Sequence, residues 1–236
     1  MSTADSAEQK VTAMFNAIAQ TYDRLNRILS LGIDRSWRKR MLRFLPKQEI
    51  LHLLDLATGT ADQLIFLLDH VPTISAAAGL DPAQEMLLLG RQKLQSKSYG
   101  ERVVLKEGHA AQIPYNDETF DCITISFGVR NFSNLPVCLK EIYRVLKKGG
   151  RLLILEFSTP PLPFIRRLYL FYLRHVLPRL GSWLSKNQTA YLYLNETIES
   201  FPSGLAFCRL LDDAGLKGAQ AHPLSFGIVT IYQADK

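Results

Sequence analysis

Acidic and small residues follow the apolar runs of this chain at positions where they could bind a nucleoside. Asp81 ends the run ISAAAGLD and lies 22 residues past Gly59. At that spacing a carboxylate commonly accepts hydrogen bonds from the two hydroxyls of a ribose. Asp81 could equally serve as the N-cap of a helix that begins near Pro82. The two roles are compatible, and the residues alone favour neither.

A loop of small residues precedes Asp81 in the chain. The run ILHLLDL leads into Ala57-Thr58-Gly59-Thr60-Ala61-Asp62. Small side chains at 57, 59 and 61 let the backbone pass close to a ligand, to which the next helix offers free N–H groups. A nicotinamide fingerprint, G-x-G-x-x-G, would need glycine in place of Asp62. The loop therefore fits S-adenosylmethionine better, with a purely structural strand-to-helix turn as the alternative.

Two later loops carry further candidate groups. His109, in the stretch 108–114, lies where a loop would close over an adenine, and it is either a cofactor contact or a solvent-facing residue. Arg130 and Asn131 directly follow the apolar run FDCITISF, in a loop loosened by Gly128. A structural arginine would normally pair with a surface carboxylate. We favour a functional role for Arg130, because it closely follows an apolar strand and is next to the amide side chain of Asn131.

These groups are positioned by short apolar runs that alternate with helical patterns, which is typical of βαβ units and a parallel sheet. Ligands of such a sheet bind beyond the carboxyl ends of the strands, where the residues above lie. The predicted strands cover 50–56, 74–81, 102–107, 120–127 and 150–157, and the predicted helices cover 61–70, 83–96 and 134–147, the last ended by Gly149-Gly150.

Further elements precede and follow this core. Two helices come first, over 8–28 and 34–44, with Asp34 as N-cap of the second. A helix near 203–214 leads to two strands, KGAQAHP and GIVTIYQ, which must pair antiparallel because a parallel pair needs a longer crossover. We expect one α/β domain over 1–236, a doubly wound Rossmann-like seven-stranded sheet with an antiparallel C-terminal hairpin. We also expect two additions to this domain: an N-terminal helical cap over 1–45, and a helical lid insertion over 158–200, after the fifth strand.

Composition excludes several classes of protein. The chain has 236 residues, 47% of them hydrophobic and 21% charged, which is unlike a disordered, collagen-like or coiled-coil protein. The three cysteines are far apart and have no metal-ligand spacing, so we expect a reducing compartment and no metal site. We expect no signal peptide and no spanning helix, and hence a cytoplasmic protein or one that lies on the cytosolic side of a membrane.

The predicted insertion is basic and aromatic. No acidic residue lies between Glu156 and Glu196, in a chain of net charge +6. Such a segment suits a helix at an interface that attracts anionic lipid and admits a greasy tail. A lid buried against the domain, with solvated arginines, is the alternative. The residues concerned are Arg166, Arg167, Arg174, Arg179 and Lys186, interleaved with Phe164, Leu168, Tyr169, Phe171, Tyr172, Leu177 and Trp183.

Taken together, these motifs resemble the ubiquinone/menaquinone biosynthesis C-methyltransferase family, within the class I S-adenosylmethionine-dependent methyltransferases. The similarity runs from about residue 15 to the C-terminus, and FGVRN and the N-terminal signature are its most specific parts. The matching segments are FNAIAQTYD at 15–23 with Asn26, Gly32 and Trp37-Arg38, then LDLATGTAD, DETFDCITISFGVRN, YRVLKKGGRLLILEFSTP and FGIVTIY.

The resemblance implies S-adenosylmethionine as cofactor and a set of residues that bind it. In this chain the cofactor-binding positions, with Gly59 of the loop added, are Gly59, Thr60, Asp81, His109, Ala110 and Ser126. The family usually has Asn or Asp in place of His109, His in place of Asp34 and Gly in place of Ala61. Because His109 departs from the family pattern, the backbone next to it is a second group that could contact the cofactor.

The resemblance also implies methyl transfer to a ring carbon of a prenylated quinol, with demethylmenaquinol as the expected substrate. An aromatic carbon becomes nucleophilic when an adjacent hydroxyl, with a pKa of about 10, loses its proton. We expect the positive charge of Arg130 to favour the phenolate, and Asn131 to orient the quinol oxygen or a water that takes the proton. Direct proton removal by Asp34 or His109 is the alternative.

The sequence is also compatible with other substrates and partners. A polyprenyl methoxy-benzoquinol is the alternative ring, while Thr58 and Ala61 favour menaquinone-type members by resemblance. A nucleic-acid methyltransferase could use the same basic and aromatic stretch, but SFGVR replaces the Asn-Pro-Pro-Tyr type of loop, so we expect no nucleic-acid partner. A non-catalytic lipid-binding module is a third class. The expected partner is an anionic membrane surface, with a homodimer or a quinone-biosynthesis assembly also open.

Overall fold

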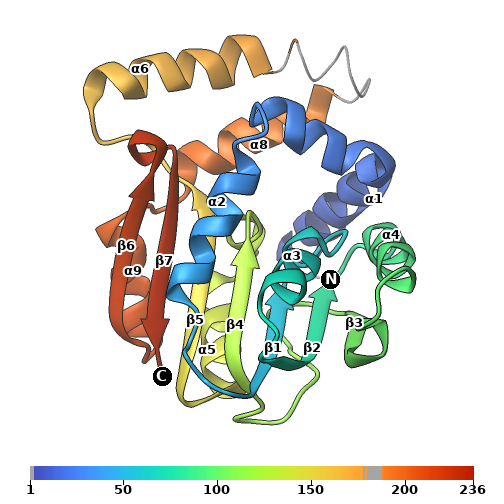
Figure 1. Cartoon of the computed structure of the whole chain (residues 1–236). Helices are drawn as coiled ribbons and strands as arrows, with labels where there is room; N and C mark the ends of the chain where they lie inside the picture. The colour runs from blue at the N-terminus through green and yellow to red at the C-terminus, as the bar shows by residue number, and fades with distance from the viewer. Residues whose placement is uncertain (1–2, 178, 180–187) are drawn as a thin grey trace.

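The centre of the protein is a seven-stranded sheet (Figure 1). The structure, a computed structural model, describes residues 3–177, 179 and 188–236. The strands are β1(Leu51–Leu56), β2(Ile74–Asp81), β3(Val103–Glu107), β4(Phe120–Ser126), β5(Leu146–Phe157), β6(Lys217–Leu224) and β7(Val229–Asp235), in the order β3-β2-β1-β4-β5-β7-β6. The first five are parallel, and β7 runs antiparallel to both β5 and β6. The predicted sheet and its antiparallel C-terminal hairpin are confirmed.

Helices cover both faces of the sheet, so alternate strand side chains enter two different cores. The helices are α2(Asp34–Met41), α3(Asp62–His70), α4(Gln84–Gln95), α5(Leu135–Val145) and α9(Leu205–Asp213), with short 3-10 turns at Leu42–Phe44 and Gly100–Arg102. Leu54 and Ile123 belong to the core beneath α5 and α9, whereas Leu53 and Cys122 belong to the core beneath α2, α3 and α4. Burial on both faces explains why the strands are almost continuous apolar runs.

A helical cap lies over the carboxyl ends of the parallel strands, at the top of Figure 1. It consists of α1(Thr3–Leu29), α6(Pro163–Phe171) continued by the π-helical turn η4(Tyr172–Val176), and α8(Gln188–Ser200). Leu25 of α1 packs with Tyr169, Leu173 and Ile198, which joins the three parts in one apolar cluster. The predicted N-terminal helices and helical insertion are thus present, while Trp183 and Lys186 lie outside the described residues.

Two predicted helix boundaries are wrong. Asp34 does not cap α2, because Ile33 holds the N-cap position and Asp34 lies in the first turn. The helix predicted to end at Gly149-Gly150 instead ends at Val145. Leu146 is fully buried and already pairs with Phe120 of β4, so strand pairing overrides the helical pattern there. Gly149, with φ 75°, lies within an irregular stretch of β5.

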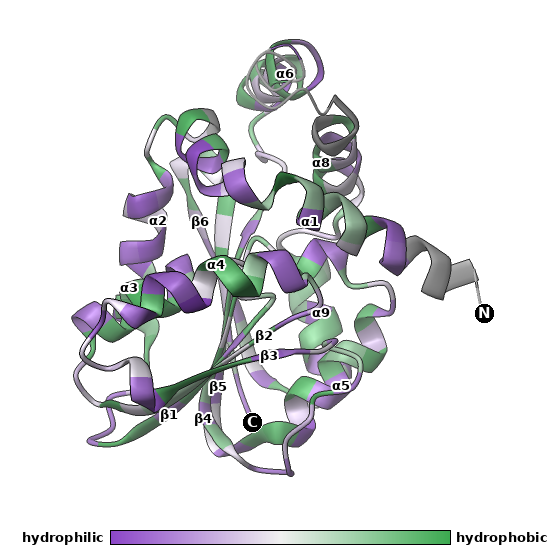
Figure 2. Ribbon diagram, turned by 90° about the vertical axis from the view of Figure 1, so that its right-hand side faces the viewer, coloured by the Kyte–Doolittle hydropathy of each residue, from purple (hydrophilic) through white to green (hydrophobic). Residues whose placement is uncertain are grey.

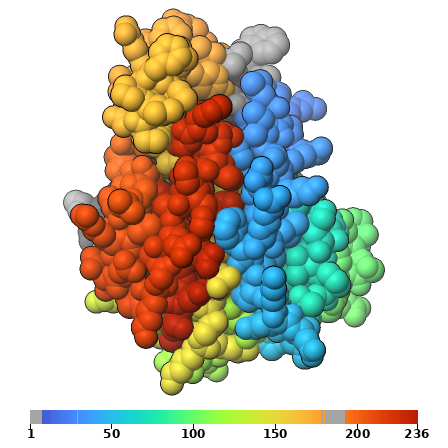
Figure 3. Space-filling model, turned by 60° about the vertical axis from the view of Figure 1, so that its left-hand side comes forward, coloured from blue at the N-terminus to red at the C-terminus, as the bar shows by residue number. Residues whose placement is uncertain are grey.

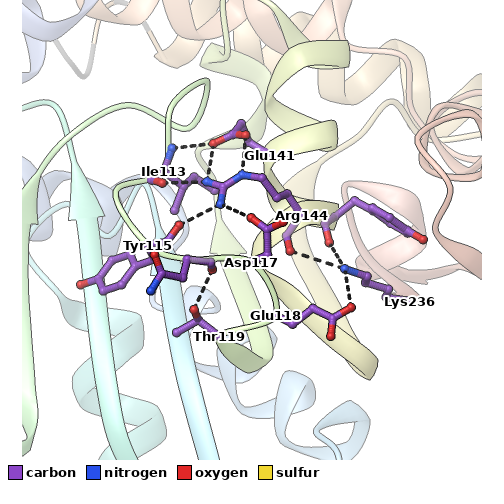
Figure 4. Close-up of polar contacts among 10 residues, drawn as sticks. Ile113, Tyr115, Asp117, Glu118, Thr119, Glu141, Arg144 and Lys236 are labelled. Atoms are coloured by element: carbon purple, nitrogen blue, oxygen red, sulfur yellow. Dashed lines mark hydrogen bonds and ion pairs between the residues drawn. The ribbon is translucent and has the colours of Figure 1, made fainter.

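Arg144 fixes the long connection between β3 and β4 (Figure 4). Its guanidinium donates hydrogen bonds to the carbonyl oxygens of Ile113 at 2.9 Å and Tyr115 at 2.8 Å, and it pairs with Asp117 and Glu141. The hydrogen bond from Arg144 lowers the pKa of Glu141 below its ordinary value. The start of this connection, 108–110, reaches the edge of the sheet that carries the site, so Arg144 anchors its far end.

No helix within the described part of the chain has the length and apolar character needed to cross a bilayer.

Candidate active site

The loop after β1 turns sharply at alternate residues. Ala57, Gly59 and Ala61 have positive φ angles of 51°, 54° and 63°. Alanine seldom adopts this left-handed backbone, so the surrounding structure must hold it. Buried Asp55 provides one tie, since it accepts hydrogen bonds from Thr58 Oγ1 at 2.7 Å and from Thr124 Oγ1 of β4 at 2.6 Å. Burial raises the pKa of Asp55 to about 6.

The loops after β1 and β4 touch one another. A Cβ atom on Gly128 would lie 2.4 Å from the Cβ of Ala57, a distance that side chains do not tolerate. Gly128 therefore permits the close approach of two loops, which is a different role from the flexibility inferred from the sequence. The contact brings the residues that follow β4 next to the loop that follows β1.

Asp81 ties the same loop to the start of α4. Its Oδ2 accepts a hydrogen bond from the backbone N–H of Gly59, and its Oδ1 accepts one from Ala83, each at 2.8 Å. Burial raises the pKa of Asp81 to about 6. Each oxygen retains a lone pair for a further donor. The carboxylate thus holds the backbone at the helix start and also lines a cavity.

That cavity is small, with a volume of about 90 Å³, and lies at the carboxyl ends of β1, β2 and β4. Apolar side chains line it together with backbone of the tight loop and the carboxylates of Glu8 and Asp81. Most of the predicted cofactor-binding residues line it, whereas Thr60 does not. The predicted residues that line this smaller cavity are Gly59, Asp81, His109, Ala110, Ser126 and Asn131.

The Thr60 side chain serves a different contact. Its hydroxyl donates a hydrogen bond to Asp23 Oδ1 of α1 at 2.6 Å and accepts one from Lys93 Nζ of α4 at 2.9 Å. Lys93 also pairs with Asp23 at 2.6 Å. Thr60 therefore joins the loop to α1 and α4.

Of the predicted residues in the smaller cavity, Ser126 has its hydroxyl directed to the sulfur of Met41, at 3.7 Å.

Helix α1 roofs the smaller cavity, a role that the motifs did not indicate. Val11, Phe15 and Tyr22 line the cavity at helical spacing, and that apolar periodicity is the signal that could have placed them there. At the N-terminal end Glu8 accepts from Ser133 Oγ at 3.0 Å and pairs with His109 Nδ1 at 2.6 Å. The His109 side chain therefore holds the N-terminal end of α1 over the cavity.

A second and larger cavity, of about 410 Å³, lies between the sheet edge and the helical cap. Its walls are mainly apolar side chains of α1, α2, α6, η4 and α8, and Phe127 and Phe157 also line it. Phe15, Tyr22 and Phe127 line both cavities, so these three side chains form the boundary between them. A ligand in one cavity would meet a ligand in the other at this boundary.

Arg130 lines the larger cavity and is held by a buried ion pair. Its Nη1 lies 2.6 Å from Glu156 Oε1 and also donates a hydrogen bond to the carbonyl oxygen of Phe127 at 2.6 Å. The two charged side chains are 6% and 0% exposed. Arg130 thus pairs with a carboxylate, as a structural arginine would, but that carboxylate is in the core rather than on the surface. Within the described residues, Nε of Arg130 has no hydrogen-bond partner.

The other candidate catalytic groups lie around the same two cavities. Asn131 follows Arg130 in the short turn Val129–Asn131 but lines the smaller cavity, and its Oδ1 accepts a hydrogen bond from Tyr193 Oη of α8 at 3.1 Å. Asp34 lines the larger cavity, is buried, and accepts a hydrogen bond from Ser30 Oγ at 2.9 Å. The described residues contain no cluster of side chains suited to hold a metal ion.

Comparison with known proteins places this geometry in a family. Over residues 3–236 the chain matches the model of the ubiE/COQ5 methyltransferase family. It is 42% identical over 231 residues to the ubiquinone/menaquinone biosynthesis C-methyltransferase UbiE of Geotalea daltonii, covering 97% of each chain. It is 39% identical to the demethylmenaquinone methyltransferase of Bacteroides fragilis, covering 97% of this chain and 93% of that one.

A solved structure supports the fold. A SAM-dependent methyltransferase of Thermotoga maritima, described as a possible histamine N-methyltransferase, superposes with a TM-score of 0.66 at 19% identity, over 95% of this chain and 99% of that one. At that identity the likeness concerns the fold alone. The family match and the relatives near 40% identity extend over almost the whole sequence, and on these grounds the chain belongs to the ubiE/COQ5 methyltransferase family.

Proposed function

We propose that this methyltransferase moves the methyl group of S-adenosylmethionine to a ring carbon of a prenylated quinol in respiratory quinone biosynthesis, and that the quinol is demethylmenaquinol. The observation that carries the proposal is the pair of cavities with a shared boundary of Phe15, Tyr22 and Phe127. One is small, with backbone and carboxylate groups suited to a nucleoside. The other is larger and apolar, as a prenylated ring requires.

The residues of the smaller cavity fit the cofactor. Asp81 retains acceptor capacity for the ribose hydroxyls, and the left-handed loop around Gly59 lets backbone approach a ligand closely. S-adenosylmethionine supplies an electrophilic methyl group on a sulfonium centre. Ligand cavities usually measure about 300–1,000 Å³, so a cavity of about 90 Å³ holds the whole cofactor only if its walls, α1 among them, move apart.

Arg130 and Asn131 are the proposed catalytic residues of this chain. Arg130 presents a fixed positive charge at the wall of the larger cavity, where it favours the phenolate form of a quinol hydroxyl. Glu156 offsets part of that charge and keeps the guanidinium in one orientation. Asn131, held by Tyr193, orients the quinol oxygen or the water that receives its proton. Asp34 is the alternative proton acceptor in the larger cavity.

A cytoplasmic enzyme that associates peripherally with a membrane fits this substrate, since the prenyl tail resides in lipid. Relatives near 40% identity carry both the ubiquinone/menaquinone name and the demethylmenaquinone name.

The ring can be identified by mass spectrometry of quinones from cells that lack the protein. We expect demethylmenaquinone to accumulate and menaquinone to disappear, because the last methyl group is then not added. Re-expression of the wild-type chain should reverse both changes. Accumulation of a desmethyl benzoquinone alone would contradict the menaquinone assignment.

Asp81→Asn should weaken binding of S-adenosylmethionine at least about tenfold, because a charge-assisted acceptor for the ribose is lost. In the wild type the ribose stabilises the ionised carboxylate, so affinity should be highest above the Asp81 pKa of about 6 and fall as the pH drops through it. Calorimetric titration at several pH values measures both effects.

Asp213→Asn, at an exposed site on α9, is the matched control and should bind the cofactor normally. Thermal unfolding without cofactor separates a binding defect from loss of the loop. An unchanged Kd for Asp81→Asn would reduce Asp81 to a partner of Gly59 and Ala83.

Arg130→Ala should lower kcat at least about tenfold and leave the Kd of S-adenosylmethionine unchanged, because Arg130 lines the larger cavity and not the smaller one. The pH profile of kcat should move to higher pH, since the pKa of the quinol hydroxyl is higher without an adjacent cation.

Arg130→Ala also leaves the buried Glu156 without its ion-pair partner. The double variant Arg130→Ala/Glu156→Gln removes that unpaired charge. It should regain stability in chemical unfolding and remain slow. Recovery of the wild-type rate in this double variant would show that Arg130 only neutralises Glu156.

A further inference from the structure

Helix α6 has apolar residues on two opposite sides. On one side Tyr169 packs into the cap cluster with Leu173 of η4. On the other, Phe164, Leu168 and Phe171 recur at i, i+4 and i+7 and form a stripe in which each side chain is more than half exposed. A helix that is apolar on both sides is normally buried on both, and the outer stripe has no packing partner among the residues that the structure describes.

Two loops extend this stripe. Leu31, between α1 and α2, is 84% exposed, and Phe226, between β6 and β7, is 75% exposed. In Figure 3 the yellow α6 forms the top of the molecule, with the red β6–β7 turn directly beneath it. Figure 2 shows α6 standing clear of the sheet. We call Leu31, Phe164, Leu168, Phe171 and Phe226 together the docking face.

The turn that presents Phe226 is held in an unfavourable conformation. Ser225 and Phe226 have positive φ angles of 47° and 59°, which bulky residues rarely adopt. Trp37 Nε1 donates a hydrogen bond to Ser225 Oγ at 2.8 Å and fixes the turn against α2. A strained backbone that exposes a phenylalanine indicates that the exposure has a use.

The docking face borders the larger cavity. Leu31 and Leu168 line that cavity and are also largely exposed, so they stand on its rim. Ser225, next to Phe226, lines the cavity as well. Whatever covers the docking face therefore meets the entrance to the proposed quinol site.

The charge beside the docking face favours an anionic partner. Arg166 and Arg167 are exposed on α6, and no acidic residue lies between Glu156 and Glu196. A second copy of the chain, related by a two-fold axis, would bring the same basic residues together. An anionic bilayer instead offers acyl chains for the apolar side chains and phosphates for the arginines, worth about fivefold in affinity for each basic residue.

We propose that the docking face inserts into the interface of an anionic bilayer and opens the larger cavity directly onto the lipid. The prenylated quinol then enters by lateral movement, ring first, with its tail still in the membrane. This inference rests on the proposed prenylated substrate, and it specifies the surface, the orientation and the lipid charge.

Vesicle flotation tests this proposal, with phosphatidylcholine vesicles made with and without phosphatidylglycerol. The wild type should float with the vesicles that contain phosphatidylglycerol. Phe164→Ser/Phe171→Ser should reduce that binding by about tenfold or more, because two inserted aromatic side chains are lost and neither lines the cavity. Arg167→Gln should reduce it by about fivefold. Leu205→Ser, at an exposed apolar site on α9, is the matched control and should float like the wild type.

Activity separates this proposal from the proposed function. The double variant should methylate a short-chain quinol in detergent at the wild-type rate, which also shows that it folds, and should lose activity on a long-chain quinol embedded in vesicles. The proposal is overturned if the wild type does not float, if the double variant floats equally well, or if the substitutions only convert a dimer to a monomer. Failure of the wild type to methylate the detergent-dispersed quinol would instead contradict the proposed function.

Discussion

The buried ion pair between Arg130 and Glu156 is the constraint on which the site depends. It joins the turn after β4 to the end of β5, where both side chains are almost inaccessible to solvent. Removal of one member of such a pair ordinarily costs about 3–5 kcal/mol, because the other charge is left unpaired in the core. Replacement of both by apolar residues is often tolerated, so stability alone does not account for the pair. Its consequence is positional: Arg130 is held between Phe127, at the boundary of the two cavities, and Asn131, in the wall of the smaller one.

The geometry divides the chemistry between two environments. The smaller cavity offers loop backbone and the Asp81 carboxylate, whereas the larger one offers mainly apolar walls and the guanidinium groups of Arg38 and Arg130. Methyl transfer to carbon requires that donor and acceptor approach in line, and the shared boundary at Tyr22 supplies that proximity. The same arrangement explains why a cap of α1, α6 and α8 is built over the sheet. The cap creates the apolar cavity and leaves its entrance on an exposed apolar surface.

Local patterns predicted the sheet well and the cavities poorly. The strands could be located within a few residues because burial on both faces leaves an apolar run in the sequence itself. Asp81 and the loop around Gly59 could be placed at the same edge of the sheet, because each directly follows a predicted strand. The roof formed by α1 and the second role of Thr60 depend on contacts between distant segments, so no local pattern contains them. Glu156 is an acidic residue in the apolar run LLILEF, and the sequence does not indicate its partner, because Arg130 comes beside it only when β4 and β5 pair.

A crystal structure with S-adenosylhomocysteine and a prenylated quinol bound together tests the shared boundary most directly. The account predicts the ribose hydroxyls on Asp81 in the smaller cavity and the quinol ring beside Arg130 in the larger one, with the ring carbon facing the sulfur past Tyr22. A quinol ring bound away from Arg130, or a nucleoside bound outside the smaller cavity, would contradict it.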